Sequence, residues 1–186
     1  MSANPRCLYN SGFNDFLRQD AKAIFGTLCD HYHGDALTTT REAWISEIEI
    51  MQAVLSKLSD DGTGQIVFEY DIPRLGKRVD VVLLYHGVVF CVEFKVGETK
   101  ILETDVDQVL DYALDLKNFH KFSQDKLIVP ILVATKYKSK TNTIQMSVYD
   151  DRVVNPLVTG EHGILDLIEK VVDKFPNAST AIRQHR

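Results

Sequence analysis

Apolar side chains recur every three or four residues in four segments of the chain, which is the spacing of one face of an α-helix. The first segment contains Ile24 and Leu28, and the second contains Trp44, Ile48 and Met51. The pattern predicts helices over residues 14–31, 37–58, 104–119 and 162–175. Each helix should pack against a core through one face and leave the other in water.

Strand patterns fill most of the remaining chain. Apolar and polar residues alternate in three consecutive segments that predict a meander, residues 65–72, 78–85 and 88–95. Residues 126–135 form an almost unbroken apolar run, typical of a strand buried on both faces. Two weaker strands are predicted over residues 143–150 and 152–157. This order of elements predicts an α/β fold, with a mixed central β-sheet flanked by helices on both faces.

The length and composition fit one globular domain. The chain has 186 residues, of which 45% are hydrophobic, and this is enough to form a sizeable core. It contains no internal repeat and no low-complexity linker. We expect a single domain with a helical N-terminal extension over residues 1–40, a core over 41–135, and C-terminal strands and a helix over 136–186.

Charge and cysteine content exclude several classes of protein. No apolar run approaches the roughly 20 residues of a membrane-spanning helix, and the N-terminus has no signal-peptide pattern. The three cysteines are isolated from one another, which argues against disulfides, a zinc site and an iron–sulfur cluster. We therefore expect a cytoplasmic protein without a membrane partner. The net charge of −5 argues against a passive coat on nucleic acid, but it is compatible with an enzyme whose acidic site binds cations.

A hairpin brings charged residues together inside two apolar strands. If His86 and Gly87 form a two-residue loop, Tyr85 pairs with Val88, and every cross-strand pair has numbers that sum to 173. This register places Asp80 opposite Glu93. Because side chains alternate between the faces of a sheet, Lys95 lies on the same face as both acids.

Two carboxylates in directly opposite positions repel each other unless one takes up a proton or a cation bridges them. Mg²⁺ and Mn²⁺ prefer carboxylate oxygens, and a lysine beside such a site can orient a water molecule. Asp80, Glu93 and Lys95 are therefore candidates for metal-assisted hydrolysis of a phosphodiester. The alternative is a solvated charged face or a surface ion pair. The apolar surroundings of the three residues favour the site.

Asp80 followed by Glu93-Phe94-Lys95 resembles the motif of the PD-(D/E)XK nuclease superfamily, although Val79 stands where the proline of that name would be. The resemblance implies a restriction-endonuclease-like core. It also implies one or two Mg²⁺ or Mn²⁺ ions held by Asp80, Glu93 and the backbone carbonyl of Phe94, with Lys95 as the catalytic lysine.

Two further features are similar to the RecB-like branch of that superfamily. Gln108 and Tyr112 are four residues apart on the next helix, as in its Q-x-x-x-Y element, which implies a role in placing the substrate strand. The alternative is a helix surface with Tyr112 packed on the sheet. The resemblance also implies an additional catalytic acid on the helix before the sheet, with Glu49 as the first choice and Glu47 as the second.

Residues 44–135 also resemble the N-terminal nuclease-like domain of bacterial predicted DNA/RNA helicases with a Schlafen-type helicase domain. In that group a P-loop helicase follows, whereas this sequence contains no G-x-x-x-x-G-K-[ST] motif. Two explanations stay open: a stand-alone or excised domain, or a helicase or ATPase on a separate polypeptide.

Together these features predict a metal-dependent nuclease acting on nucleic acid, with DNA favoured over RNA, as part of a helicase-linked processing or antiviral defence system. Arg78 belongs to basic residues that either line the substrate backbone or merely balance nearby acids. The alternative function is a weak or inactive nuclease-fold module that binds nucleic acid or an ATPase partner. The sequence leaves open whether the protein forms a homo-oligomer.

Overall fold

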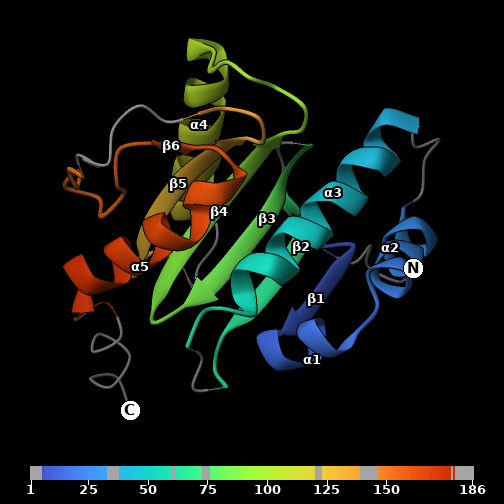
Figure 1. Ribbon diagram of the computed structural model, residues 1–186. Coiled ribbons are helices and arrows are strands. Elements are labelled where there is room, and N and C mark those ends of the chain that lie inside the picture. The colour runs from blue at the N-terminus through green and yellow to red at the C-terminus, as the bar shows by residue number, and fades with distance from the viewer. Residues whose placement is uncertain are drawn as a thin grey trace.

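The structure, a computed structural model, describes residues 6–32, 38–59, 62–72, 76–119, 123–138, 146–176 and 178. Six strands form one sheet in the order β1-β2-β3-β4-β5-β6 (Figure 1). Their bounds are β1 (Tyr9–Gly12), β2 (Gln65–Ile72), β3 (Lys77–Tyr85), β4 (Val88–Lys95), β5 (Leu127–Ala134) and β6 (Leu157–Thr159). Neighbours from β1 to β4 are antiparallel, and β4, β5 and β6 are parallel. The predicted α/β fold with a mixed sheet is confirmed.

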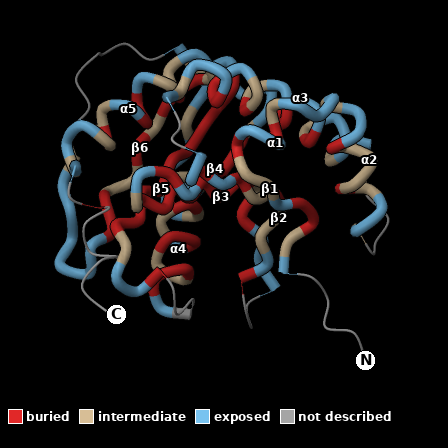
Figure 2. The backbone as a smooth tube through the Cα atoms, turned by 90° about the horizontal axis from the view of Figure 1, so that it is seen from below, coloured by how far each residue is buried: buried red, intermediate tan, exposed pale blue. Residues whose placement is uncertain are grey.

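Helices cover both faces of the sheet, as predicted (Figure 2). One face packs against α1 (Phe13–Arg18), α2 (Ala21–His31), α3 (Thr38–Leu55) and α5 (Ile164–Lys174). The other face packs against α4 (Glu103–Phe119) through apolar residues such as Val109 and Leu116. Strands β4 and β5 lie between the two layers, which explains why almost all of their residues are buried and apolar.

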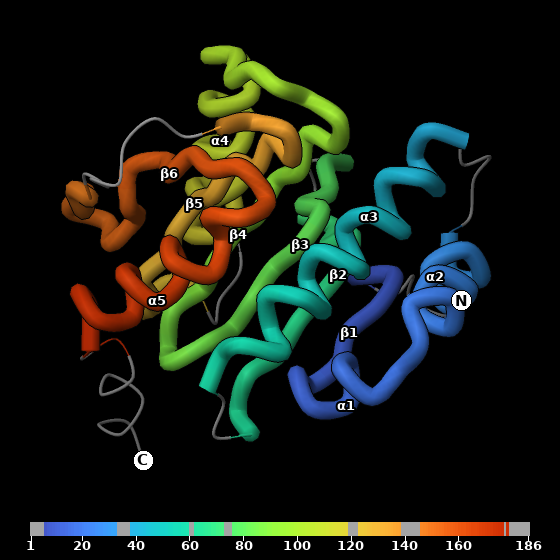
Figure 3. The backbone as a smooth tube through the Cα atoms, viewed as in Figure 1, coloured from blue at the N-terminus to red at the C-terminus, as the bar shows by residue number. Residues whose placement is uncertain are grey.

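The N-terminal segment is not the separate helical extension that the sequence predicts. Strand β1 pairs with β2 at the edge of the sheet (Figure 3). The predicted helix over 14–31 is interrupted between α1 and α2, where the Asp20 carboxylate accepts a hydrogen bond from the Lys22 N–H and caps the second helix. Residues between 8 and 32 therefore contribute to the core of the domain.

The prediction of two weak strands over residues 143–150 and 152–157 is wrong. Residues 143–145 lie outside the described part of the chain, and residues 146–150 form only one isolated bridge, from Val148 to Val154. Val153 makes another isolated bridge, to Ile128. Continuous pairing with β5 begins only at Leu157, opposite Ile131.

The hairpin register is confirmed, and Tyr85 pairs with Val88 around a turn in which both His86 and Gly87 have positive φ. Strand β2 contains a local irregularity at Glu69, a non-glycine residue with φ of +53°. Phe68 packs with the α3 side of the core, whereas Tyr70 packs on the α4 side. At Glu69 the even-numbered residues of β2 therefore change from the α3 side of the sheet to the α4 side.

Candidate active site

Strands β3 and β4 part at the level of Asp80. The β-ladder between them runs from Tyr85–Val88 to Val81–Val92 and does not continue to Asp80 and Glu93. Instead, the Phe94 N–H donates a hydrogen bond of 2.8 Å to Asp80 Oδ2. A carboxylate thus takes the place of a strand carbonyl, and this opening between two strands is where the predicted acids meet.

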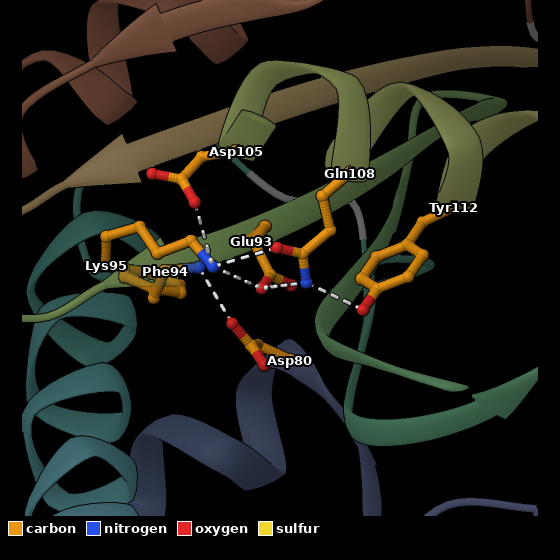
Figure 4. Close-up of polar contacts among 7 residues, drawn as sticks. All are labelled: Asp80, Glu93, Phe94, Lys95, Asp105, Gln108 and Tyr112. Atoms are coloured by element: carbon orange, nitrogen blue, oxygen red, sulfur yellow. Dashed lines mark hydrogen bonds and ion pairs between the residues drawn. The ribbon is translucent and has the colours of Figure 1, made fainter. Parts of the chain in front are cut away.

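On the α4 side of the opening, a hydrogen-bonded network holds Glu93 and Lys95 (Figure 4). Lys95 Nζ lies 3.1 Å from Glu93 Oε1 and 3.0 Å from Gln108 Oε1. Gln108 Nε2 donates to Glu93 Oε1 at 3.0 Å and to the Tyr112 hydroxyl at 2.7 Å. The structure brings both predicted helix residues to the acids, and the i, i+4 spacing is what puts them on one face.

Asp105 is a member of this network that sequence reasoning missed. Its Oδ1 lies 3.6 Å from Lys95 Nζ (Figure 4). Asp105 precedes Gln108 by three residues, so the same helical spacing could have found it. Lys95 is therefore placed between two carboxylates on different elements.

The expectation for Glu49 is wrong, and Glu47 occupies the place proposed for it. Glu47 is buried, with 4% of its surface exposed, whereas Glu49 is exposed and lines a surface hollow with Lys57 and His162. Glu47 follows Trp44 by three residues and precedes Met51 by four, so it shares their core-facing side of α3. Glu49 is at neither of these spacings from Trp44 and Met51, so its side chain points away from the core.

Glu69 on β2 is another acid at this site that sequence reasoning missed. Its side chain is 13% exposed, and its Oε1 accepts a 2.8 Å hydrogen bond from Trp44 Nε1. Repulsion from Glu69 contributes to the raised pKa values of Glu47, Asp80 and Glu93. Regular alternation along β2 gave no reason to place it there, because the left-handed backbone at Glu69 interrupts the pattern.

The acids are protonated more readily than ordinary carboxyl groups. Burial, followed by repulsion from Glu69 and Glu93, raises the pKa of Glu47 to about 8. Burial and repulsion from Glu93 raise the pKa of Asp80 well above its usual range. Burial also raises the pKa of Glu93, against the lowering effect of Lys95. The opening therefore concentrates negative charge where water is scarce, and a proton or a cation is favoured there.

Lys95 keeps its charge despite its partial burial. Burial alone would lower the pKa of Lys95, but Glu93, Asp105 and Asp80 raise it above its ordinary value. The side chain is 24% exposed, so the ammonium retains contact with solvent. At neutral pH Lys95 is thus a hydrogen-bond donor and a fixed positive charge, and it cannot serve as a proton acceptor.

The carboxylate oxygens of the site meet some, but not all, of the requirements for binding a hard divalent cation. Oε2 of Glu47 and Oε2 of Glu93 are buried and have no hydrogen-bond donor, which leaves two carboxylate oxygens for a cation. Over the described ranges, no three His, Cys, Asp or Glu side chains form a ready-made metal site. Hydrogen bonds from Phe94, Lys95 and Gln108 already occupy other carboxylate oxygens, so a cation would compete with these donors.

Binding of Mn²⁺ should raise the melting temperature of the protein. An ion present at about 100 times its Kd stabilises the folded state by about 2.7 kcal/mol, which corresponds to about 5–10 °C at this chain length. Scanning calorimetry in Mn²⁺ and in EDTA measures the shift. Asp80→Asn should remove most of it, and Asp107→Asn, an exposed acid on α4, should retain it. An undiminished shift in Asp80→Asn would contradict the placement of the ion.

Comparison of the chain with protein families, curated proteins and solved structures finds no match in any of the three. Among the described helices, none has both the length and the apolar character needed to cross a membrane.

Proposed function

We propose that this protein is a divalent-metal-dependent nuclease that hydrolyses phosphodiester bonds, with DNA as the preferred substrate. The observation that supports it best is the convergence of Glu47, Asp80 and Glu93 with protonated Lys95 where two strands part. Acids gathered in a partly dry opening are costly unless a cation offsets their repulsion. A structural role alone gives no reason to retain them.

Asp80, Glu93 and Glu47 are the residues that would hold Mg²⁺ or Mn²⁺. The orphaned oxygens of Glu47 and Glu93 favour this assignment, and the Phe94 carbonyl stays a predicted ligand. The bound ion supplies activation of water and neutralisation of charge on the phosphate. The chain's own part is to hold these oxygens on three separate elements, α3, β3 and β4, around one opening.

Lys95 donates hydrogen bonds toward the reacting groups. Its ammonium is held by Glu93, Gln108 and Asp105, so its direction is set before substrate arrives. A positioned cation stabilises negative charge that develops on the phosphate oxygens and orients the attacking water. Gln108 and Tyr112 hold Glu93 in place and border the path of the substrate strand.

Cleavage of labelled single- and double-stranded DNA in Mn²⁺ tests the proposal directly. The wild-type protein should cleave in Mn²⁺ and not in EDTA, and Asp80→Ala should be inactive. Asp107→Asn provides a matched control for the loss of one acid, because Asp107 is exposed on α4. Equal activity of the wild-type protein and Asp80→Ala, or cleavage that persists in EDTA, would refute the proposal.

A second candidate is a nuclease-fold module that binds nucleic acid or an ATPase partner without cleaving. It is favoured by the hydrogen bonds that Phe94, Lys95 and Gln108 donate to the acids, because a cation would have to compete with them. This candidate predicts DNA binding with no hydrolysis in Mn²⁺. A pull-down with a helicase or ATPase, followed by a cleavage assay on the mixture, distinguishes it from a nuclease that requires its partner.

A further inference from the structure

Four side chains form a closed ring of contacts beside the acids. Trp44 Nε1 donates to Glu69 Oε1 at 2.8 Å, and Glu69 Oε2 lies 3.7 Å from a guanidinium nitrogen of Arg78. The Arg78 guanidinium lies over the Tyr32 ring, 5.3 Å from its centre. The Tyr32 ring meets the Trp44 ring edge to face, with centres 5.4 Å apart. The four side chains together connect the end of α2 to α3, β2 and β3.

Glu69 is the member of this four-residue cluster whose conformation and burial are energetically unfavourable. Its backbone has φ of +53°, a conformation that is unfavourable for a non-glycine residue. Its carboxylate is 13% exposed, and Trp44 beneath it is 1% exposed. Strain and a largely buried charge together, next to the acids of the opening, indicate a functional position.

Both oxygens of Glu69 have partners within the ring. Oε1 accepts a hydrogen bond from Trp44, and Oε2 faces Arg78. By contrast, the buried Oε2 atoms of Glu47 and Glu93 have no hydrogen-bond partner. This arrangement suits a carboxylate that orients a guanidinium better than one that binds a cation. Glu69 is therefore distinguished chemically from the acids assigned to the ion.

Arg78 is the member of the ring that reaches water. Its side chain is 40% exposed, with its guanidinium carbon over the Tyr32 ring and Glu69 at one nitrogen. A guanidinium held by a cation–π contact and a carboxylate is restricted in position, and its remaining donors suit the oxygens of a phosphate. Arg78 precedes Asp80 by two residues on β3, a separation of about 6–7 Å along a strand.

We propose that Arg78 binds a backbone phosphate next to the one at the acids, and that Glu69 and Tyr32 are positioning residues that hold its guanidinium for this contact. The inference rests on the proposed function, since it names the part of the substrate strand that lies beyond the acids. It assigns Arg78 to binding of the strand and leaves the reacting phosphate to Asp80, Glu93 and Lys95.

Steady-state cleavage kinetics in Mn²⁺ and fluorescence anisotropy of a labelled oligonucleotide in EDTA test the inference. Arg78→Ala should raise KM and the oligonucleotide Kd about tenfold, with kcat within about twofold. It should also reduce the slope of log Kd against log salt concentration by about one. Arg41→Ala, at an exposed position on α3, is the matched control and should leave all these values unchanged.

Glu69→Gln should raise KM and Kd about threefold in the wild-type background and have no further effect when Arg78 is already alanine. Arg78→Lys should recover only part of the binding, because a lysine keeps the charge and loses the planar guanidinium. Glu42→Gln, an exposed glutamate on α3, controls for the loss of one acid. Tyr32→Leu supplies the same test if Glu69→Gln does not fold, and it should also have no effect in the Arg78→Ala background.

The possible outcomes separate this inference from the proposed function. Wild-type cleavage with unchanged KM and Kd in Arg78→Ala would overturn the inference and leave the nuclease assignment intact. Weaker Mn²⁺ binding by Glu69→Gln would also overturn it, because Glu69 would then be a cation ligand. A wild-type protein that does not cleave would refute the proposed function, and the anisotropy measurements would still decide the role of Arg78.

Discussion

Replacing Lys95 with methionine should lower kcat for Mn²⁺-dependent cleavage about 10²- to 10³-fold while the protein stays folded. Methionine keeps an unbranched side chain of similar length but removes the ammonium that lies 3.1 Å from Glu93 and 3.6 Å from Asp105. The charge that develops on the phosphate then loses its fixed positive partner. Removal of the ammonium also leaves the buried Glu93 carboxylate without its ion pair, so thermal unfolding of the variant is measured beside its cleavage rate.

The same variant should bind Mn²⁺ at least as tightly as the wild-type protein does, since a competing positive charge beside Glu93 is gone. Calorimetric titration of the metal and single-turnover cleavage measure the two effects separately. Lys100→Met, at an exposed position five residues along the chain, is the matched control and should retain full activity. A kcat for Lys95→Met within twofold of the wild-type value would remove Lys95 from the catalytic site.

Replacing Glu47 with glutamine should stabilise the metal-free protein, and the gain should grow with pH. The folded-state pKa of Glu47 is raised to about 8 from an ordinary value of 4.5, so the folded protein binds this proton more tightly than the unfolded chain does. The wild-type protein therefore loses stability as pH rises from about 4.5 to about 8, where the buried carboxyl must ionise. Glutamine is neutral at every pH, so the free energy of unfolding of Glu47→Gln does not fall in this way as the pH rises.

The expected difference in the free energy of unfolding is on the order of 4 kcal/mol at pH 8 and close to zero near pH 4.5. Urea denaturation in EDTA at several pH values measures it. Glu49→Gln, at an exposed position two residues away, controls for the loss of one acid from α3. Glu47→Gln should at the same time lose cleavage activity and much of the stabilisation by Mn²⁺. If the difference between Glu47→Gln and the wild-type protein were the same at every pH, the raised pKa of Glu47 would be contradicted.

Much of the site follows from local periodicity. A two-residue loop at His86 and Gly87 sets the register of β3 against β4, and alternation along β4 puts Glu93 and Lys95 on one face. Helical spacing places Gln108 and Tyr112 together. These relations depend on geometry that repeats every two or four residues, so they can be predicted without knowledge of the rest of the fold.

The same helical periodicity distinguishes Glu47 from Glu49, and it favours Glu47 as the buried acid on α3. Glu47 lies three residues after Trp44 and four before Met51, both of which are buried, and this spacing puts it on the core side of α3. Glu49 is exposed because its position on the helix points away from that side. The helical stripe was available in the sequence, and it favours Glu47.

By itself, the sequence determined the α/β architecture, the hairpin register and the sharing of one face by Glu93 and Lys95, because repeating backbone geometry specifies each of them. Only the tertiary structure decided that β3 and β4 part at Asp80 and that Glu69 turns toward Trp44 through a left-handed backbone. Burial by several elements at once raises the pKa values of the acids. Such burial depends on how α3 and α4 pack on opposite faces of the sheet, and no local pattern encodes that packing.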